Sequence, residues 1–197
     1  HHKRHAFYIH HRVGATKEGK ITAMQVELVA DCGAYASSST AVLANAVLLS
    51  PGPYDVPNVH VDGHVVYTNN IRTGAMRGFG APQAIFAIEL QMSKLAEKLG
   101  IDPATLRLKN ALAEGSLLAT NTVVPAGVGI RQTLLEVTEA AGWSDKGPPR
   151  PEARAPYLRT GVGLASGWKN VGYSFGFPEQ CTCTTELSGE QDIERAV

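Results

Sequence analysis

The chain has 197 residues, 44% of them hydrophobic, and its 18 basic and 18 acidic side chains give no net charge. This length favours one large domain or one domain and part of a second, and a neutral chain without a basic stripe does not indicate a nucleic-acid-binding protein. The longest apolar runs fall short of the roughly 20 residues that cross a bilayer, so we expect a cytoplasmic protein without a membrane segment.

The first 70 residues predict three strands and one short helix. Residues 5–35 alternate in hydrophobicity on both sides of a turn at Lys17–Gly19, which indicates an antiparallel hairpin. The small apolar stretch "TAVLANAVLLS", residues 40–50, fits a short helix that is closed by proline and glycine turn signals. Residues 59–70 form a third predicted strand.

A glycine-rich turn, "RGFGAPQ" at residues 77–83, follows the third strand directly and leads into a long helix. The helix is predicted from about Gln83 to Leu99, with Gly100 at its end. Its apolar residues are expected to pack on the sheet, and its charged residues to turn mostly away from it. The first set is Ile85, Ile88, Met92 and Leu95, and the second is Glu89, Lys94, Glu97 and Lys98.

Two more helices are predicted before the composition changes. One begins after the N-cap Asp102 with Pro103 in its first turn, and an amphipathic helix follows within residues 130–143. We therefore predict an α+β fold, in which a twisted antiparallel sheet has helices packed on one side.

A domain boundary is expected after residue 144. Residues 145–158 are rich in proline and charge and are typical of a linker, whereas residues 159–197 predict the start of a second β-rich domain. The sequence stops as a further strand pattern begins, which indicates a fragment because backbone groups in a strand need partners.

The turn at Arg77–Gly80 is the strongest candidate site. Glycines between a strand and a helix let backbone N–H groups approach a phosphate or oxyanion, although an ordinary connecting turn is the alternative. The pattern matches neither the dinucleotide nor the P-loop motif. Phe79, held between two glycines, and Phe175 in "GYSFGFPEQ" could sandwich a planar substrate or could pack in the core.

Other reactive side chains predict little chemistry. Cys32, Cys181 and Cys183 are too few for a four-thiolate iron–sulfur or zinc site, so any redox centre must come from elsewhere. The spacing of His5 and His10 on a strand makes no recognised ligand pair, and Glu179 and Glu186 have no identifiable partner.

"TNNIRTGAMRGFGAPQ" and "GWKNVGYSFGFPEQC" resemble the molybdopterin-binding large subunit of the xanthine dehydrogenase and aldehyde oxidase family of molybdenum hydroxylases. The resemblance extends from "KRHAF" to "ELSGEQDIE". It implies that residues 1–144 are the C-terminal part of a first molybdopterin-binding domain, and that residues 159–197 are the N-terminal part of a second.

The resemblance also implies roles for the two motifs. The backbone of Arg77, Gly78, Phe79 and Gly80 would lie beside the molybdenum and its pterin, and Phe79 and Phe175 would flank an aromatic substrate. The family oxidises an electron-poor carbon with water as the oxygen source. The complete subunit would bind molybdopterin with molybdenum, and iron–sulfur clusters and FAD are expected on partner subunits or domains.

Departures from the family pattern bear on substrate and activity. Asn45 stands where purine-oxidising relatives have an arginine, and Gly176 where some have a threonine, so an aromatic N-heterocycle or an aldehyde is expected rather than xanthine. The motif of the family's catalytic glutamate is absent, so no catalytic residue is predicted here and the chain alone is expected to be inactive. The alternative is a truncated or degenerate scaffold module that binds no cofactor.

Overall fold

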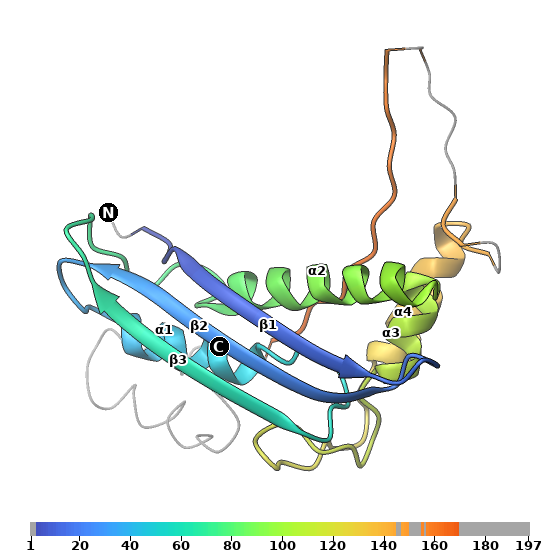
Figure 1. Cartoon of the computed structure of the whole chain (residues 1–197), viewed down its shortest axis with the longest axis horizontal. Coiled ribbons are helices and arrows are strands. Elements are labelled where there is room, and N and C mark those ends of the chain that lie inside the picture. The colour runs from blue at the N-terminus through green and yellow to red at the C-terminus, as the bar shows by residue number, and fades with distance from the viewer. Residues whose placement is uncertain (1–2, 145–146, 150–154, 156, 170–197) are drawn as a thin grey trace.

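A computed structural model describes residues 3–144, 147–149, 155 and 157–169 (Figure 1). The elements are β1 (Phe7–Ala15), β2 (Ile21–Gly33), α1 (Ser39–Leu49), β3 (Val59–Tyr67), α2 (Ala81–Leu99), α3 (Pro103–Asn110) and α4 (Ile130–Ala140). The α+β class is therefore confirmed. The predicted start of a second domain falls mostly on residues 170–197, which lie outside the described residues.

The sheet is mixed rather than antiparallel throughout. β1 and β2 form the predicted hairpin, with Phe7 opposite Ala30. β3 pairs with the other edge of β2 in the parallel direction, with Met24 opposite Val59, so the antiparallel prediction is wrong for this strand. The reason is α1, which lies between the two strands and returns the chain to the end where β2 began. Such a crossover makes neighbouring strands parallel.

One face of the sheet forms the core. On β2, Met24, Val26 and Leu28 are buried, while the residues between them are exposed. They join Ile88 and Met92 of α2 in a single hydrophobic cluster, to which α1 also contributes. Figure 1 shows α1 and α2 behind the sheet on this same face, as predicted. The third helix packs on α2, and α4 packs on α3.

The long helix follows its prediction closely at both ends. It begins at Ala81 and ends at Leu99, and Gly100 closes it in the left-handed conformation with φ 66°. Ile88 and Met92 are fully buried as expected, whereas Ile85 and Leu95 are only partly buried.

The prediction that Glu89 lies on the exposed polar face of α2 is wrong, because this residue is only 5% exposed. Its Oε2 lies 2.8 Å from Nε of Arg107, which is fully buried, and Tyr54 donates a short hydrogen bond to its Oε1. A buried carboxylate is tolerated only with such partners. Burial, and then the negative charge of Glu89, raise the pKa of the Tyr54 phenol.

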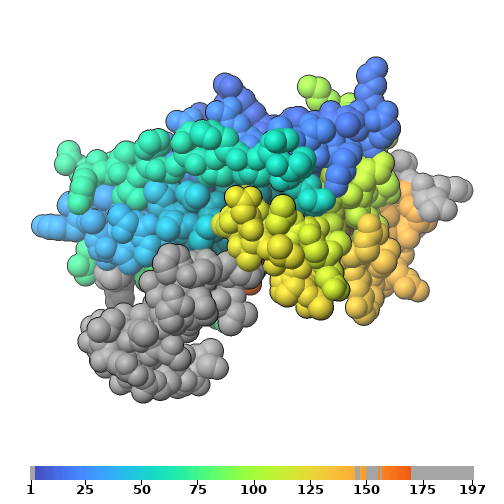
Figure 2. Space-filling view, turned by 90° about the horizontal axis from the view of Figure 1, so that it is seen from below, coloured from blue at the N-terminus to red at the C-terminus, as the bar shows by residue number. Residues whose placement is uncertain are grey.

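A second, smaller hydrophobic cluster lies beneath the loop that follows α3. Leu112, Leu118 and Val124 form its buried centre, and Trp168 packs against it from the far end of the described chain. In Figure 2 this loop, residues 111–129, appears in yellow beside α4. None of the helices in the described residues is both long and apolar enough to cross a membrane.

His11 gives the fold a specific dependence on pH. This residue of β1 faces a groove against α2, and neither ring nitrogen has a hydrogen-bond partner in the described part of the chain. Burial, followed by the neighbouring His10, lowers the pKa of His11 from 6.5 to about 4. The unfolded chain therefore takes up this proton at a higher pH than the folded chain, so stability is complete above pH 6.5 and falls towards pH 4.

We expect His11 to remove roughly 2 kcal/mol from the free energy of unfolding between pH 7 and pH 4.5. The comparison of His11→Phe with the parent chain in urea unfolding at both pH values isolates this contribution from that of the carboxylates. His64→Phe is the control, because His64 is exposed on β3 and is not among the groups that shift the pKa of His11. An equal loss of stability in the parent and in His11→Phe would contradict this assignment.

Candidate functional site

The glycine-rich turn has an unusual backbone. Gly78, Phe79 and Gly80 all have positive φ values, of 93°, 47° and 93°. A left-handed phenylalanine costs of the order of 1 kcal/mol and persists only where surrounding contacts hold it. The sequence-predicted site is therefore a run of three left-handed residues between the third strand and the first turn of α2.

Close packing on both sides requires the two glycines. A Cβ on Gly78 would lie 2.5 Å from Cγ of Pro82, and a Cβ on Gly80 would lie 2.4 Å from the carbonyl oxygen of Val42. Real Cβ atoms do not approach backbone oxygens this closely. The turn is thus wedged between α1 and the start of α2.

The carbonyl groups of the turn are held by hydrogen bonds. Two bonds are local, since Met76 O accepts from Phe79 N at 2.7 Å and Gly78 O accepts from Ala81 N at 2.9 Å. The other two come from distant side chains. Nη2 of Arg4 donates to Arg77 O at 2.8 Å, and Nδ2 of Asn45 donates to Phe79 O at 2.6 Å.

Three N–H groups of the turn have no acceptor within the described chain, namely those of Arg77, Gly78 and Gly80. They lie at the N-terminal end of a 19-residue helix, whose dipole favours negative charge there. The turn can therefore accept an anionic group such as a phosphate or an oxyanion.

Asn45 is brought directly to the turn. It is 3% exposed, and its Oδ1 is buried without a hydrogen-bond donor among the described residues. An unsatisfied buried acceptor of this kind costs about 1–3 kcal/mol, so the Oδ1 is a natural position for a donor from a bound molecule. The unpaired Oδ1 of Asn45 and the N–H groups of the turn without acceptors fit a bound cofactor or substrate.

The segment before β1 completes the surroundings of the turn. Nε2 of His5 lies 2.7 Å from Oγ of Ser39 on α1, and Nε2 of Gln83 donates to His5 O at 3.0 Å. Burial lowers the pKa of His5, against an opposing effect of Asp31. His5 thus joins this segment to α1 and α2, and Arg4 joins it to the turn.

Phe175 and Gly176, the second predicted pair, lie outside the described residues, as do Cys181, Cys183, Glu179 and Glu186. The last described residues nevertheless lie beside the turn. Gly167, Trp168 and Lys169 line a hollow of about 400 Å³ together with Gly78, Ala81, Pro82 and Ile85. The segment that precedes Phe175 thus lies against the turn that carries Phe79.

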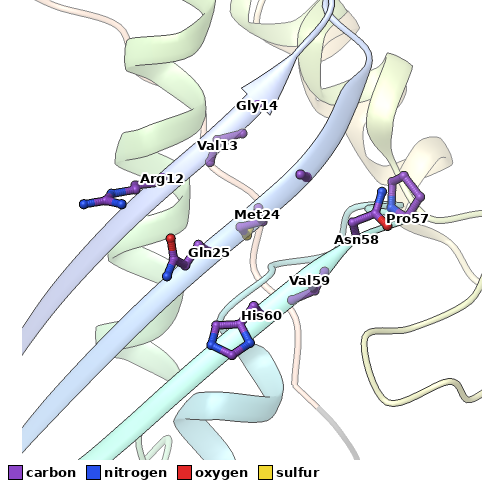
Figure 3. Close-up of a pocket in the computed structure, with 10 residues that line it drawn as sticks. Arg12, Val13, Gly14, Met24, Gln25, Pro57, Asn58, Val59 and His60 are labelled. Atoms are coloured by element: carbon purple, nitrogen blue, oxygen red, sulfur yellow. The ribbon is translucent and has the colours of Figure 1, made fainter.

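A larger hollow of about 680 Å³ lies elsewhere, over the ends of the three strands. Figure 3 shows Arg12, Gln25 and His60 along it, one from each strand, and these three are paired directly across the sheet. No residue of the glycine-rich turn lines it. This hollow exceeds in volume the one beside the turn, but the strained backbone, the N–H groups without acceptors and the unpaired Oδ1 of Asn45 favour the turn as the site.

The sequence did not predict the hydrogen bonds of Arg4 and His5 or the burial of Glu89. Glu89 had a usable signal, because it falls at helical spacing from Ile85, Met92 and Ala96 on the stripe that packs inward. A carboxylate in that stripe indicates a buried partner. Arg4 and His5 had no local signal, because their contacts with the turn and α1 join residues 73 and 34 positions apart.

An α+β domain whose left-handed glycine turn has N–H groups without acceptors in the described chain, beside the unpaired Oδ1 of buried Asn45, is suited to an anionic ligand. Residues 1–111, which include the sheet and the turn, match the family described as the molybdopterin cofactor-binding domain. The chain belongs to this family, which occurs in the large subunits of xanthine dehydrogenases and aldehyde oxidoreductases.

Curated relatives support this family. The nicotinate dehydrogenase large molybdopterin subunit of Eubacterium barkeri is 49% identical over 139 residues, which are 71% of this chain and 33% of that protein. A probable xanthine dehydrogenase subunit of Bacillus subtilis is 35% identical over 97% of this chain and 25% of its own length. The chain thus spans a third or less of these relatives.

A solved structure agrees with the fold. Aldehyde oxidoreductase from Desulfovibrio gigas superimposes with a TM-score of 0.63 at 35% sequence identity. The match covers 71% of this chain and 16% of that structure. The predicted resemblance to this family is therefore confirmed.

Proposed function

We propose that this chain is part of the molybdenum-binding subunit of a hydroxylase, and that the Arg77–Gly80 turn lies against its cofactor. The observation that supports this most directly is the left-handed turn. Its carbonyls accept hydrogen bonds, whereas the N–H groups of Gly78 and Gly80 have no acceptor in the described chain. Membership of the cofactor-binding family supports the same assignment.

The molybdenum cofactor, when bound, supplies the transfer of oxygen from water to an electron-poor carbon. The chain's own residues bind and orient. The open N–H groups at Gly78 and Gly80 would hold an anionic part of the cofactor, while Arg4 and Asn45 keep the carbonyls turned into the protein. Phe79, only partly buried, would present its ring to a planar substrate together with Phe175.

The substrate we propose is an aromatic N-heterocycle, with an aldehyde as the second choice. Asn45 is neutral at the position where purine-oxidising relatives have an arginine, and its Oδ1 can accept a hydrogen bond from a substrate or a cofactor. The Eubacterium barkeri relative, which is named for nicotinate, supports a heterocycle. Gly176 adds no side chain where some relatives have a threonine.

Partners follow from the same proposal. Relatives are named as subunits, and this chain spans only part of them, so the rest of the large subunit would complete the site. Iron–sulfur clusters and FAD on partner subunits or domains would carry the electrons away.

The test uses the complete subunit with its partners, purified from source cells and assayed for molybdenum, N-heterocycle oxidation and aldehyde oxidation. We expect Phe79→Ala to raise KM for the heterocycle at least tenfold with molybdenum content unchanged. Phe86→Ala is the matched control, because Phe86 is 71% exposed on the helix that follows the turn and should leave KM unaltered. Absence of molybdenum would favour the scaffold alternative, and equal behaviour of both variants would remove Phe79 from the site.

A further inference from the structure

The segment at residues 157–169 has no helix or strand, yet hydrogen bonds from Ser166 and Trp168 hold it to the domain. Figure 1 shows it, in orange to red, passing across α2 towards α1. Most of its side chains are exposed, but Ser166 is only 4% exposed. The buried contact is made by the backbone of Ser166, whose N–H donates to Oε2 of Glu89 at 2.9 Å.

The carboxylate that accepts this bond is held in place by Arg107, which has hydrogen bonds of its own. Oε2 of Glu89 is also 2.8 Å from Nε of Arg107, and the guanidinium is held by Pro103 O at 3.2 Å and Ser93 Oγ at 3.1 Å. Hydrogen bonds to an ionised acceptor are roughly twice as strong as neutral ones. The helices α2 and α3 therefore present a rigid, buried carboxylate to a passing backbone.

A second contact follows two residues later. Nε1 of Trp168 donates to Leu49 O, at the end of α1, at 3.4 Å. The ring packs on the cluster of Leu112, Leu118 and Val124, and also lines the hollow beside Gly78. The anchored Ser166 is therefore two residues from the side chain that meets the glycine-rich turn.

We propose that Glu89, oriented by Arg107, is an internal binding site for the backbone of this segment and a positioning residue for the hollow that Trp168 forms with the glycine-rich turn. Ser166 is the anchored residue, and Trp168 transmits its placement to the turn. The role in the site rests on the proposed function. The anchoring itself does not, because it depends only on contacts within this chain.

Amide hydrogen exchange in the unmodified 197-residue chain tests the anchor directly. We expect the Ser166 amide to exchange at least about tenfold more slowly than those of Ala165 and Gly167, which donate to no acceptor in the described chain. Exchange of the Ser166 amide at the rate of its two neighbours would overturn the proposal. Because the experiment uses the unmodified chain, its result does not depend on whether a variant folds.

A pair of variants at one position then tests the consequence, in a Trp143→Phe background that leaves Trp168 as the sole indole. Ser166→Pro removes the donor, and we expect red-shifted Trp168 emission and at least about twofold greater acrylamide quenching with unchanged helical circular dichroism. Ser166→Ala keeps the N–H and should match its parent. Unchanged emission in folded Ser166→Pro would also overturn the proposal.

In the complete subunit, Ser166→Pro should raise KM for the substrate about tenfold at unchanged molybdenum content, and Ser166→Ala should not. A changed fluorescence with an unchanged KM would overturn the positioning role but leave the anchor intact. If the complete subunit holds no cofactor, the proposed function fails, while the exchange and fluorescence results still decide the anchor.

Discussion

Gly80→Ala is expected to lower the free energy of unfolding by about 3 kcal/mol and to abolish molybdenum retention in the complete subunit. The new Cβ would lie 2.4 Å from Val42 O, which is backbone and cannot rotate away. The turn and α1 would have to separate, and the bond from Asn45 to Phe79 O would be lost. Urea unfolding and metal analysis measure the two effects.

Gly127→Ala is the matched control for Gly80→Ala. Gly127 has φ 90°, nearly the same as the 93° of Gly80, but a Cβ there would meet no described atom within 4 Å. It should therefore cost only the backbone strain, about 1 kcal/mol. Equal losses for the two variants would mean that strain alone, and not the contact with α1, makes glycine necessary at residue 80.

Arg107→Met is expected to lower the free energy of unfolding by about 3–5 kcal/mol, which is more than Gly80→Ala. Among the described residues, the substitution leaves the buried Glu89 carboxylate with only Tyr54 and the Ser166 N–H as partners. For a protein whose total stability is of the order of 10 kcal/mol, this is a large fraction. The thermal midpoint should fall by roughly 10 °C.

Two further variants separate the charge from the packing. Arg107→Met with Glu89→Gln should recover part of the lost stability, because the neutral amide no longer needs a buried cation. Lys20→Met breaks an ion pair with Asp55 whose side chains are 45% and 40% exposed, and it should cost less than about 1 kcal/mol. A double variant less stable than Arg107→Met would contradict the buried-charge explanation.

Local patterns predicted the elements well. The hairpin, the helix ends at Gly100 and Asp102 and the short helix at residues 39–49 all depend on turn chemistry, capping and periodicity within a few residues. Two features were not predicted, for different reasons. The direction of β3 depends on the path of α1 in space, and the burial of Glu89 depends on Arg107, 18 residues away on another helix.

The candidate site also has one part that local sequence predicts and one part that it does not. The turn itself was predictable, because two glycines around one aromatic residue require left-handed backbone or close packing, and both are present. Asn45 was assigned from the resemblance as a substrate residue, and its bond to Phe79 O adds a role in holding the turn. Arg4 could not be assigned, because nothing near it in sequence indicates an acceptor at residue 77.

The long spans of these hydrogen bonds have a kinetic consequence. The contacts that hold the turn and its neighbours join residues 34, 73 and 77 positions apart. Closing such loops costs entropy before any contact compensates for it, so these bonds should form late in folding, after the hairpin and α2. An isolated peptide of residues 71–100 should therefore form part of a helix in water but should not acquire the left-handed turn at its start.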